Sequence, residues 1–188
     1  MITPFEETCL SQAIELADLN ARRGYFPYAA LLVCGEQILA EASNTVKIPE
    51  GVQDLPIFET PIAHPETALV IHAFNLVQER FPEDPRAQRE MLLSLSIISN
   101  IEPCPMCARA MAGALIQRVV FAVDGETALR ASGVEGTLPQ SNQETFLKEY
   151  GLHLSSEGPH LRDVALKSFV SVWNRVQALE RLASTDNG

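Results

Sequence analysis

Hydrophobic residues at the start of the chain follow a helical period. From Pro4 to about Arg22, apolar side chains lie three or four positions apart: Phe5, Cys9, Ala13, Leu16 and Leu19. Gly24 follows where a helix C-cap is expected, so the pattern predicts an amphipathic helix. Two short apolar runs, residues 28–34 and 37–41, then flank Gly35-Glu36, a spacing typical of a β-hairpin.

Helical and strand-like patterns alternate along the rest of the chain. We expect helices over residues 66–78, 106–116, 142–150 and 158–182. A polar helical stretch that ends at Met91 is expected after the first of these helices. We expect strands over 93–99 and 118–123 and an edge strand over 152–155. Helices alternating with apolar strands indicate a three-layer α/β/α sandwich, and the hairpin makes its five-stranded sheet mixed.

The chain reads as one domain over residues 1–188, with a core of about 4–136 and a more variable helical part over 137–183. Residues 44–61 contain three prolines and one glycine and show no sustained hydrophobic period, so we expect a loop of unusual length. A long ordered loop usually serves a site, and we expect the same here.

Charge and composition limit the class of partner. The 188 residues carry a formal charge of -10, from 14 Lys and Arg against 24 Asp and Glu, which disfavours a nucleic-acid substrate. A local basic patch around Arg109, Arg118 or Arg130 stays open as an alternative. No apolar run is long enough to span a bilayer, and the first residues are acidic, so a soluble cytoplasmic protein is expected.

Four cysteines are too few for a disulfide scaffold in a chain of this length. Cys104 and Cys107 form a C-x-x-C pair, which favours metal or redox chemistry. Cys9 lies in the first helical pattern and Cys34 ends an apolar run, so we expect both to be buried small hydrophobic residues.

His64, Cys104 and Cys107 supply the three nitrogen and sulfur ligands of a catalytic zinc site, whose fourth position belongs to water. Both motifs lie at the start of a predicted helix, where the helix dipole favours thiolates. Pro65 suits the first turn of its helix. Glu66 would point past the ligands toward the water, as a general base must.

The order H-x-E…P-C-x-x-C is the signature of zinc-dependent nucleobase deaminases. The segments Ala63-His-Pro-Glu-Thr and Glu102-Pro-Cys-Pro-Met-Cys-Ala-Arg-Ala-Met-Ala resemble the cytidine deaminase superfamily, in particular its guanine, cytosine and tRNA adenosine deaminases. The resemblance implies the cytidine deaminase-like fold, one Zn²⁺ per chain and a homodimer, for which residues 111–116 are a candidate contact. A sheet or helix of the same monomer is an equally good partner for residues 111–116. The resemblance also implies substrate contacts at Asn44, Ala63, Pro103 and Phe26.

Two stretches depart from the family pattern. His-Pro-Glu replaces the usual His-Ala-Glu, which stiffens the motif but suits a first helical turn. Residues 25–30, Tyr-Phe-Pro-Tyr-Ala-Ala, replace a glycine-containing Gly-Pro-Phe-Gly-Ala stretch that lines the substrate pocket of relatives. This second departure bears on which substrate is bound.

The expected reaction is hydrolytic deamination of a small nucleobase or nucleoside. Guanine or a related aminopurine is the first choice, because the chain is acidic and lacks an arginine-rich C-terminal helix. Cytosine or cytidine and tRNA adenosine are the alternatives, as is a non-catalytic deaminase-like partner subunit. A redox C-x-x-C, or a structural zinc closed by Cys9, Cys34 or another histidine, leaves Glu66 without a role.

The remaining histidines and loop acids have simpler explanations. His72, His153 and His160 are expected at the surface or at strand ends. Asp124, Glu126 and Glu135 follow a strand where relatives place substrate-recognising acids, but solvated loop positions are the preferred interpretation.

Overall fold

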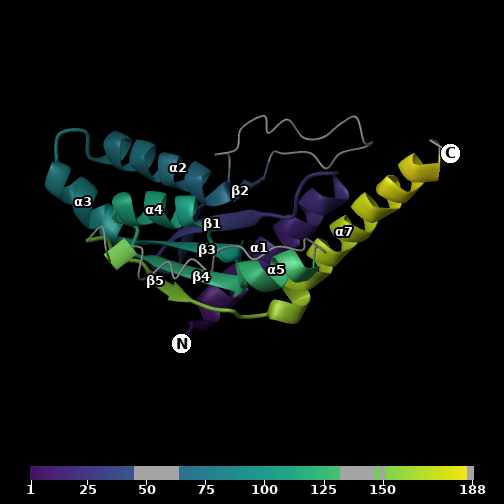
Figure 1. Cartoon of the computed structure of the whole chain (residues 1–188). Coiled ribbons are helices and arrows are strands. Elements are labelled where there is room, and N and C mark those ends of the chain that lie inside the picture. Colours follow the sequence, from purple (N-terminus) through teal and green to yellow (C-terminus); the bar gives the residue numbers. More distant parts are fainter. Residues whose placement is uncertain (45–63, 132–146, 149–150, 186–188) are drawn as a thin grey trace.

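The computed structural model describes residues 1–44, 64–131, 147–148 and 151–185. Its centre is a five-stranded sheet in the order β2-β1-β3-β4-β5 (Figure 1). The strands are β1 (Ala29–Cys34), β2 (Gln37–Ser43), β3 (Leu95–Ile101), β4 (Arg118–Val123) and β5 (Ser155–Glu157). β1 runs antiparallel to β2 and β3, whereas β3, β4 and β5 run parallel, which confirms the mixed sheet.

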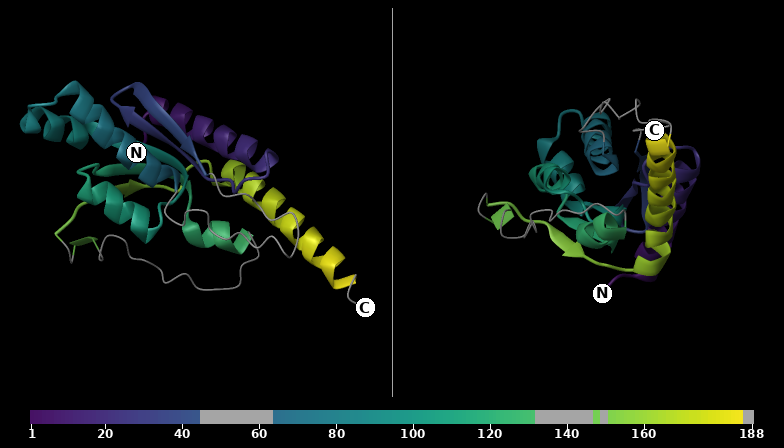
Figure 2. Two further views of the ribbon diagram at one scale, coloured as in Figure 1. Left: turned by 90° about the horizontal axis from the view of Figure 1, so that it is seen from above. Right: turned by 45° about the vertical axis from the view of Figure 1, so that its right-hand side comes forward.

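Helices cover both faces of the sheet. On one face lie α2 (Pro65–Arg80) and α4 (Pro105–Gly113), with α3 (Pro85–Ser94) against α2. On the other lie α1 (Pro4–Arg22) and α7 (Arg162–Thr185), with α5 (Gly125–Ala131) against α7. Figure 2 shows α2, α3 and α4 on the opposite side of the strands from α7, so the predicted three-layer sandwich is confirmed.

Two apolar clusters hold the layers together, one on each face. Successive side chains of a strand point to opposite faces, so Leu32 and Ile97 pack with α2 while Leu31 and Ile98 pack with α1. All four are fully buried. This double burial explains why β1 and β4 are nearly continuous apolar runs rather than alternating ones.

Two predicted boundaries around β3 and α4 were wrong. Leu93 and Ser94 belong to α3, because Asp84 caps that helix through Ala87 N–H and the strand begins only at Leu95. α4 ends at Gly113 rather than residue 116, because Leu115 adopts a positive φ of 65° and turns the chain toward β4. Ile116 is still fully buried, which explains why its hydrophobicity extended the helical pattern.

The last strand and helix start later than predicted. β5 covers residues 155–157 instead of 152–155, and α7 begins at Arg162 instead of 158. Between them the chain passes close to β4: a Cβ at Gly158 would lie 2.6 Å from the Phe121 ring, and His160 N–H donates to the Phe121 carbonyl. A helix cannot begin until the chain has left this contact.

The predicted loop over 44–61 lies outside the described residues except for Asn44, and the predicted helix over 142–150 does so except for residues 147–148. Leu147 is buried in the cluster on the α2 face. Among the described helices, none combines the length and the apolar character that crossing a membrane requires.

Candidate metal and catalytic site

Two helix N-termini on the same face of the sheet carry the predicted ligands. His64 is the N-cap of α2 and Cys104 is the N-cap of α4, and each is followed by a proline at the first helical position. Proline suits that position because its missing N–H would have no partner there. The two motifs therefore use the same local device, and the α2–α4 contact brings them together.

The ligand atoms form a triangle with nearly equal edges. His64 Nδ1 lies 3.5 Å from Cys104 Sγ and 3.4 Å from Cys107 Sγ, and the two sulfur atoms are 3.5 Å apart. A tetrahedral zinc ion with bonds of about 2.0 Å to nitrogen and about 2.3 Å to sulfur separates its ligands by roughly 3.5 to 3.8 Å. The three predicted ligands therefore fit one zinc ion, bound through Nδ1 of the imidazole.

The contact between the two sulfur atoms shifts the pKa values of the two thiols in opposite directions. The hydrogen bond between Cys104 and Cys107 lowers the pKa of Cys104 to about 4, with a further contribution from His64. The same contact raises the pKa of Cys107, as do its burial and the nearby Glu66 carboxylate. The Cys104 sulfur in turn raises the pKa of His64. A lowered thiol pKa favours the thiolate form that binds zinc.

Glu66 lies in the first turn of α2 beside the ligands, and it is only 3% exposed. Burial raises the pKa of its carboxyl, while a hydrogen bond from Ser99 and the charge of His64 act in the opposite direction. A raised pKa suits a group that must accept and return a proton near neutral pH. The arrangement therefore combines three residues that could hold a metal ion with one adjacent buried carboxyl.

No fourth protein ligand joins the triangle among the described residues, where the metal-binding group consists of His64, Cys104 and Cys107. Cys9 is buried as predicted, but on the opposite face of the sheet. Cys34 is only half-buried and contacts Ser94 Oγ, and His72 is exposed on α2. This arrangement favours a site with an open position over a purely structural zinc.

An aromatic wall stands beside the imidazole. The Phe26 and Tyr28 rings are stacked with centroids 6.1 Å apart, and Tyr28 lies 6.4 Å from the His64 ring. Phe169 from α7 supports Tyr28 from behind at 5.8 Å. Burial and the nearby negative groups Glu66 and Cys104 raise the pKa of Tyr28, so it stays a neutral hydroxyl.

Two buried asparagines hold this wall in place. Asn20 Nδ2 donates to the carbonyls of Phe26 and Asn44, at 2.9 and 2.8 Å. Asn100 accepts from Ala29 N–H and donates to the Pro27 carbonyl, both at 2.8 Å. The segment that replaces the glycine-containing stretch of relatives is therefore fixed by side chains of α1 and β3.

The predicted substrate contacts are partly placed by the structure. Asn44 is buried, and its N–H donates to the Tyr28 carbonyl, so it lies next to the aromatic wall. Phe26 belongs to that wall, and Pro103 is buried directly before Cys104. Ala63 lies outside the described residues. Contact of these residues with a substrate stays a prediction.

The loop acids after β4 hold local structure. Asp124 accepts from Thr127 N–H at the start of α5 and forms an ion pair with Arg162 at 3.2 Å. Glu126 pairs with Arg130 one helical turn away. Glu135 lies outside the described residues. His153 is exposed, whereas His160 is half-buried, and its Nε2 atom has no hydrogen-bond partner in the described structure.

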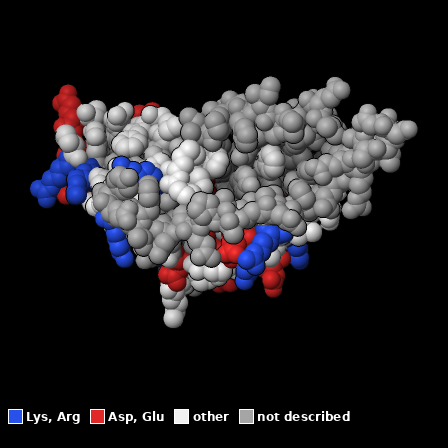
Figure 3. Space-filling model, viewed as in Figure 1, with Lys and Arg blue, Asp and Glu red and all other residues white. Residues whose placement is uncertain are grey.

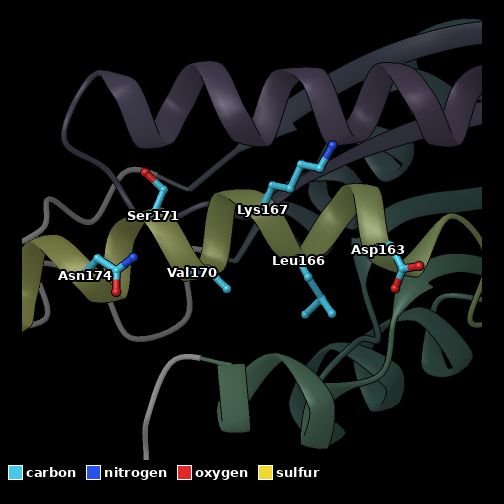
Figure 4. A pocket seen from close by; sticks show the side chains of 6 residues that line it. All are labelled: Asp163, Leu166, Lys167, Val170, Ser171 and Asn174. Atoms are coloured by element: carbon cyan, nitrogen blue, oxygen red, sulfur yellow. The ribbon is translucent and has the colours of Figure 1, made fainter.

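Two of the basic residues singled out from the sequence are paired with acids. Arg118 pairs with Glu6 at 2.8 Å and Arg130 with Glu126, and on the face shown in Figure 3 the described Lys and Arg side chains lie in several separate places. An open groove of about 520 Å³ lies along α7, away from the metal triangle (Figure 4). Its lining residues include Asp163, Lys167 and Asn174, and none is a predicted site residue.

Sequence reasoning missed the residues that support the site from behind. Ser99, Asn100, Asn20 and Phe169 come from three different elements. A signal existed for Ser99 and Asn100, since two adjacent polar residues stand near the end of a central strand that otherwise contains only one polar residue, Ser96. Nothing in the sequence pattern distinguishes Phe169 from other core residues of α7.

Comparison with known families gives a match over most of the described core. The model of the cytidine and deoxycytidylate deaminase zinc-binding region matches residues 4–123, which include all three ligands and Glu66. A tRNA-specific adenosine deaminase of Haemophilus influenzae is 33% identical over 118 residues. That stretch covers 62% of this chain but only 57% of the relative's length.

Solved structures with the same fold include purine-related proteins. A protein in complex with 2,6-diaminopurine superposes with a TM-score of 0.63 at 19% identity, covering 93% of this chain and 84% of the other. A guanine deaminase from Nitrosomonas europaea gives 0.59 at 21% identity, covering 93% and 86%. A tRNA:A34 deaminase gives 0.54 at 19% identity, covering 88% and 99%. These likenesses confirm the fold.

Proposed function

Because this chain belongs to the cytidine and deoxycytidylate deaminase family, we propose that it is a zinc-dependent hydrolase that deaminates a nucleobase or nucleoside. The observation that supports the proposal most is the buried Glu66 carboxyl beside a three-ligand metal triangle. A structural zinc or a redox cysteine pair needs no such neighbour.

His64, Cys104 and Cys107 would hold the zinc ion, which when bound lowers the pKa of a water molecule far below its bulk value, to about 7. Glu66 accepts the proton of the water that attacks the ring carbon bearing the exocyclic amine. It donates that proton to the ring nitrogen, then takes the remaining proton of the added hydroxyl and passes it to the amine, which leaves as ammonia while the carbon becomes a carbonyl. Pro103, directly before Cys104, is the proposed contact for the departing amine through its carbonyl.

The flat aromatic wall of Phe26 and Tyr28 is the proposed surface against which the base lies, with Asn44 as a polar contact. We propose guanine or a related aminopurine as substrate. The relatives include guanine and tRNA adenosine deaminases, so the choice rests on this chain's charge of -10, which opposes binding of a folded RNA. Cytosine, cytidine and tRNA adenosine are the alternatives.

The test combines zinc analysis with ammonia release from guanine, 2,6-diaminopurine, cytosine, cytidine, adenosine and tRNA. We expect one zinc ion per chain and turnover of an aminopurine. Glu66→Gln should lower kcat by about 10² to 10⁴ while keeping its zinc, because a positioned acid–base group contributes that factor. Glu79→Gln, an exposed glutamate on the same helix, is the matched control and should match wild type.

Turnover of tRNA alone would overturn the aminopurine proposal and keep the deaminase one. Full zinc occupancy with no ammonia from any substrate would instead favour the partner-subunit function. Equal activity of Glu66→Gln and wild type would contradict the proposed role of the carboxyl.

Homodimer formation is also a proposal, and of the two partners expected for residues 111–116, a second copy or the same monomer, burial favours the same monomer. Met111 and Ile116 are fully buried inside the monomer, because the small-residue face of α4 packs on α2 and the sheet. Those side chains are not available to a second copy. Multi-angle light scattering of the purified chain measures its mass directly, and a value matching a single 20.6 kDa chain would contradict the dimer.

A further inference from the structure

A serine hydroxyl lies in direct contact with the proposed proton-exchanging group. Ser99 Oγ donates a hydrogen bond of 2.8 Å to Glu66 Oε1. Ser99 is completely buried, in the middle of the sheet on β3, between Ala30 of β1 and Phe121 of β4. The contact therefore joins the rigid centre of the sheet to the first turn of α2.

A second hydrogen bond agrees with this direction. Ser99 Oγ accepts from the backbone N–H of Ile101 at 3.4 Å. A hydroxyl has one proton and two lone pairs, so Ser99 can accept from Ile101 while its own proton is donated to the ionised carboxylate. Ser99 consequently acts as a donor to Oε1 of Glu66.

Packing alone does not explain a serine at this position. The preceding residues on the same face of β3, Leu95 and Ile97, are apolar and pack in the cluster with α2. Burying a hydroxyl is unfavourable unless it is hydrogen-bonded, and here its partner is a charged group. The first polar residue on this face of β3 is Ser99, where the strand comes into contact with Glu66.

We propose that Ser99 is a positioning residue for the deamination proposed above, on which this inference rests. Its hydroxyl holds Oε1 of Glu66 in place and leaves Oε2 as the oxygen that takes the proton from water and returns it to the substrate. A glutamate side chain has three rotatable torsions, and one directional bond to a rigid strand removes much of that freedom. Preorganisation of this kind raises the rate of the chemical step rather than substrate affinity.

The kinetic test compares Ser99→Ala with a matched loss of a buried hydroxyl elsewhere. We expect Ser99→Ala to lower kcat by about 10- to 100-fold, the factor associated with a hydrogen bond to a charged group, with KM changed less than about twofold. Ser99→Thr keeps the donor and should retain most of the activity. Ser168 is buried to 2% and donates only within α7, to the Ala165 carbonyl, so Ser168→Ala should match wild type.

A second readout does not depend on turnover. Crystal structures of the zinc-loaded proteins should show Glu66 in one rotamer in wild type and Ser99→Thr, and displaced or in two rotamers in Ser99→Ala. All variants should keep one zinc ion per chain. An unchanged kcat and an unchanged Glu66 rotamer in Ser99→Ala would overturn the inference, and so would loss of zinc from that variant.

The two proposals can fail separately. If wild type deaminates a substrate and Glu66→Gln does not, while Ser99→Ala is fully active, only the role of Ser99 is wrong. If wild type releases no ammonia from any substrate of the panel, the proposed function is wrong, and the role of Ser99 in this reaction fails with it.

Discussion

At the scale of single residues, three side chains from two distant segments converge on one point because each caps or begins a helix. His64 and Cys104 occupy N-cap positions, and Cys107 follows one turn later. Residues at such positions are held by the helix itself, while their side chains stay free to face a ligand. The backbone carbonyl of His64 is in turn fixed by Thr67, whose hydroxyl donates to it at 2.8 Å.

Loss of one ligand should release the metal. Cys104→Ala leaves only two protein ligands, so we expect zinc content to fall from one ion per chain to about a tenth or less, with loss of ammonia release. Metal analysis by mass spectrometry measures this directly. Cys34→Ala is the control, because Cys34 lies outside the triangle and should keep full zinc. Full zinc in Cys104→Ala would contradict the ligand assignment.

At the scale of elements, side chains at the ends of helices and strands tie distant parts of the chain to one another. Thr3 and Glu6 form a capping box at the start of α1, and Glu6 also reaches Arg118 at the start of β4. Asn100 near the end of β3 fixes the segment before β1. These contacts place α1 and the aromatic wall relative to the sheet.

The Glu6–Arg118 pair should make stability depend on pH. Burial alone would raise the pKa of Glu6, but the Arg118 hydrogen bond and charge together with the cap hold it below its usual 4.5. A lowered folded-state pKa contributes stability above the unfolded-state value, and this is lost as the pH falls through the folded-state pKa.

We therefore expect Glu6→Gln to lower the free energy of unfolding by about 1 kcal/mol at pH 7. The difference from wild type should shrink as the pH falls from 4.5 through the lowered folded-state pKa of Glu6, because the wild-type carboxyl then becomes neutral like the glutamine. Urea denaturation at pH 7 and pH 3.5 measures it. Glu7→Gln, at an exposed position in the same helical turn, should have a smaller effect, and an equal effect would show that the helix dipole dominates.

Removal of Asn100 should be costly. Asn100→Ala leaves the buried Ala29 N–H and Pro27 carbonyl without partners, so we expect a loss of about 2 to 4 kcal/mol. Asn75→Ala on the exposed face of α2 is the control and should change stability by less than about 0.5 kcal/mol. Equal unfolding midpoints in urea for both variants would show that these hydrogen bonds contribute nothing net.

At the scale of the whole molecule, the C-terminal helix is part of the core rather than an appendage. α7 lies against α1 and β4, and its Phe169 is buried in the cluster on the α1 face. That ring also touches Tyr28 of the aromatic wall. The helix thus connects the proposed substrate surface to the layer that contains α1, and in Figure 1 it rises along the right-hand side of the molecule to the C-terminus.

Truncation of that ring tests the connection. Phe169→Ala should lower the free energy of unfolding by about 3 to 5 kcal/mol, because a large aromatic side chain is removed from a closed core. It should also raise KM if Tyr28 lines the substrate surface. Val170→Ala, one residue on and 41% exposed, should change neither by much. A stable Phe169→Ala variant would indicate that α7 is only loosely attached.

The sequence by itself determined the layers, the mixed sheet and the chemistry of the metal site. The spacing of hydrophobic residues reflects which face of a helix or strand is buried, so it can be read along the chain. The H-x-E and C-x-x-C motifs are also local, because each lies within the first turn of one helix. Only the tertiary structure decided that Ser99 reaches Glu66, that Asn20 and Asn100 hold the aromatic wall, and that α4 is covered by its own monomer. These contacts join residues far apart in the chain, and a local pattern carries no information about which distant partner a side chain meets.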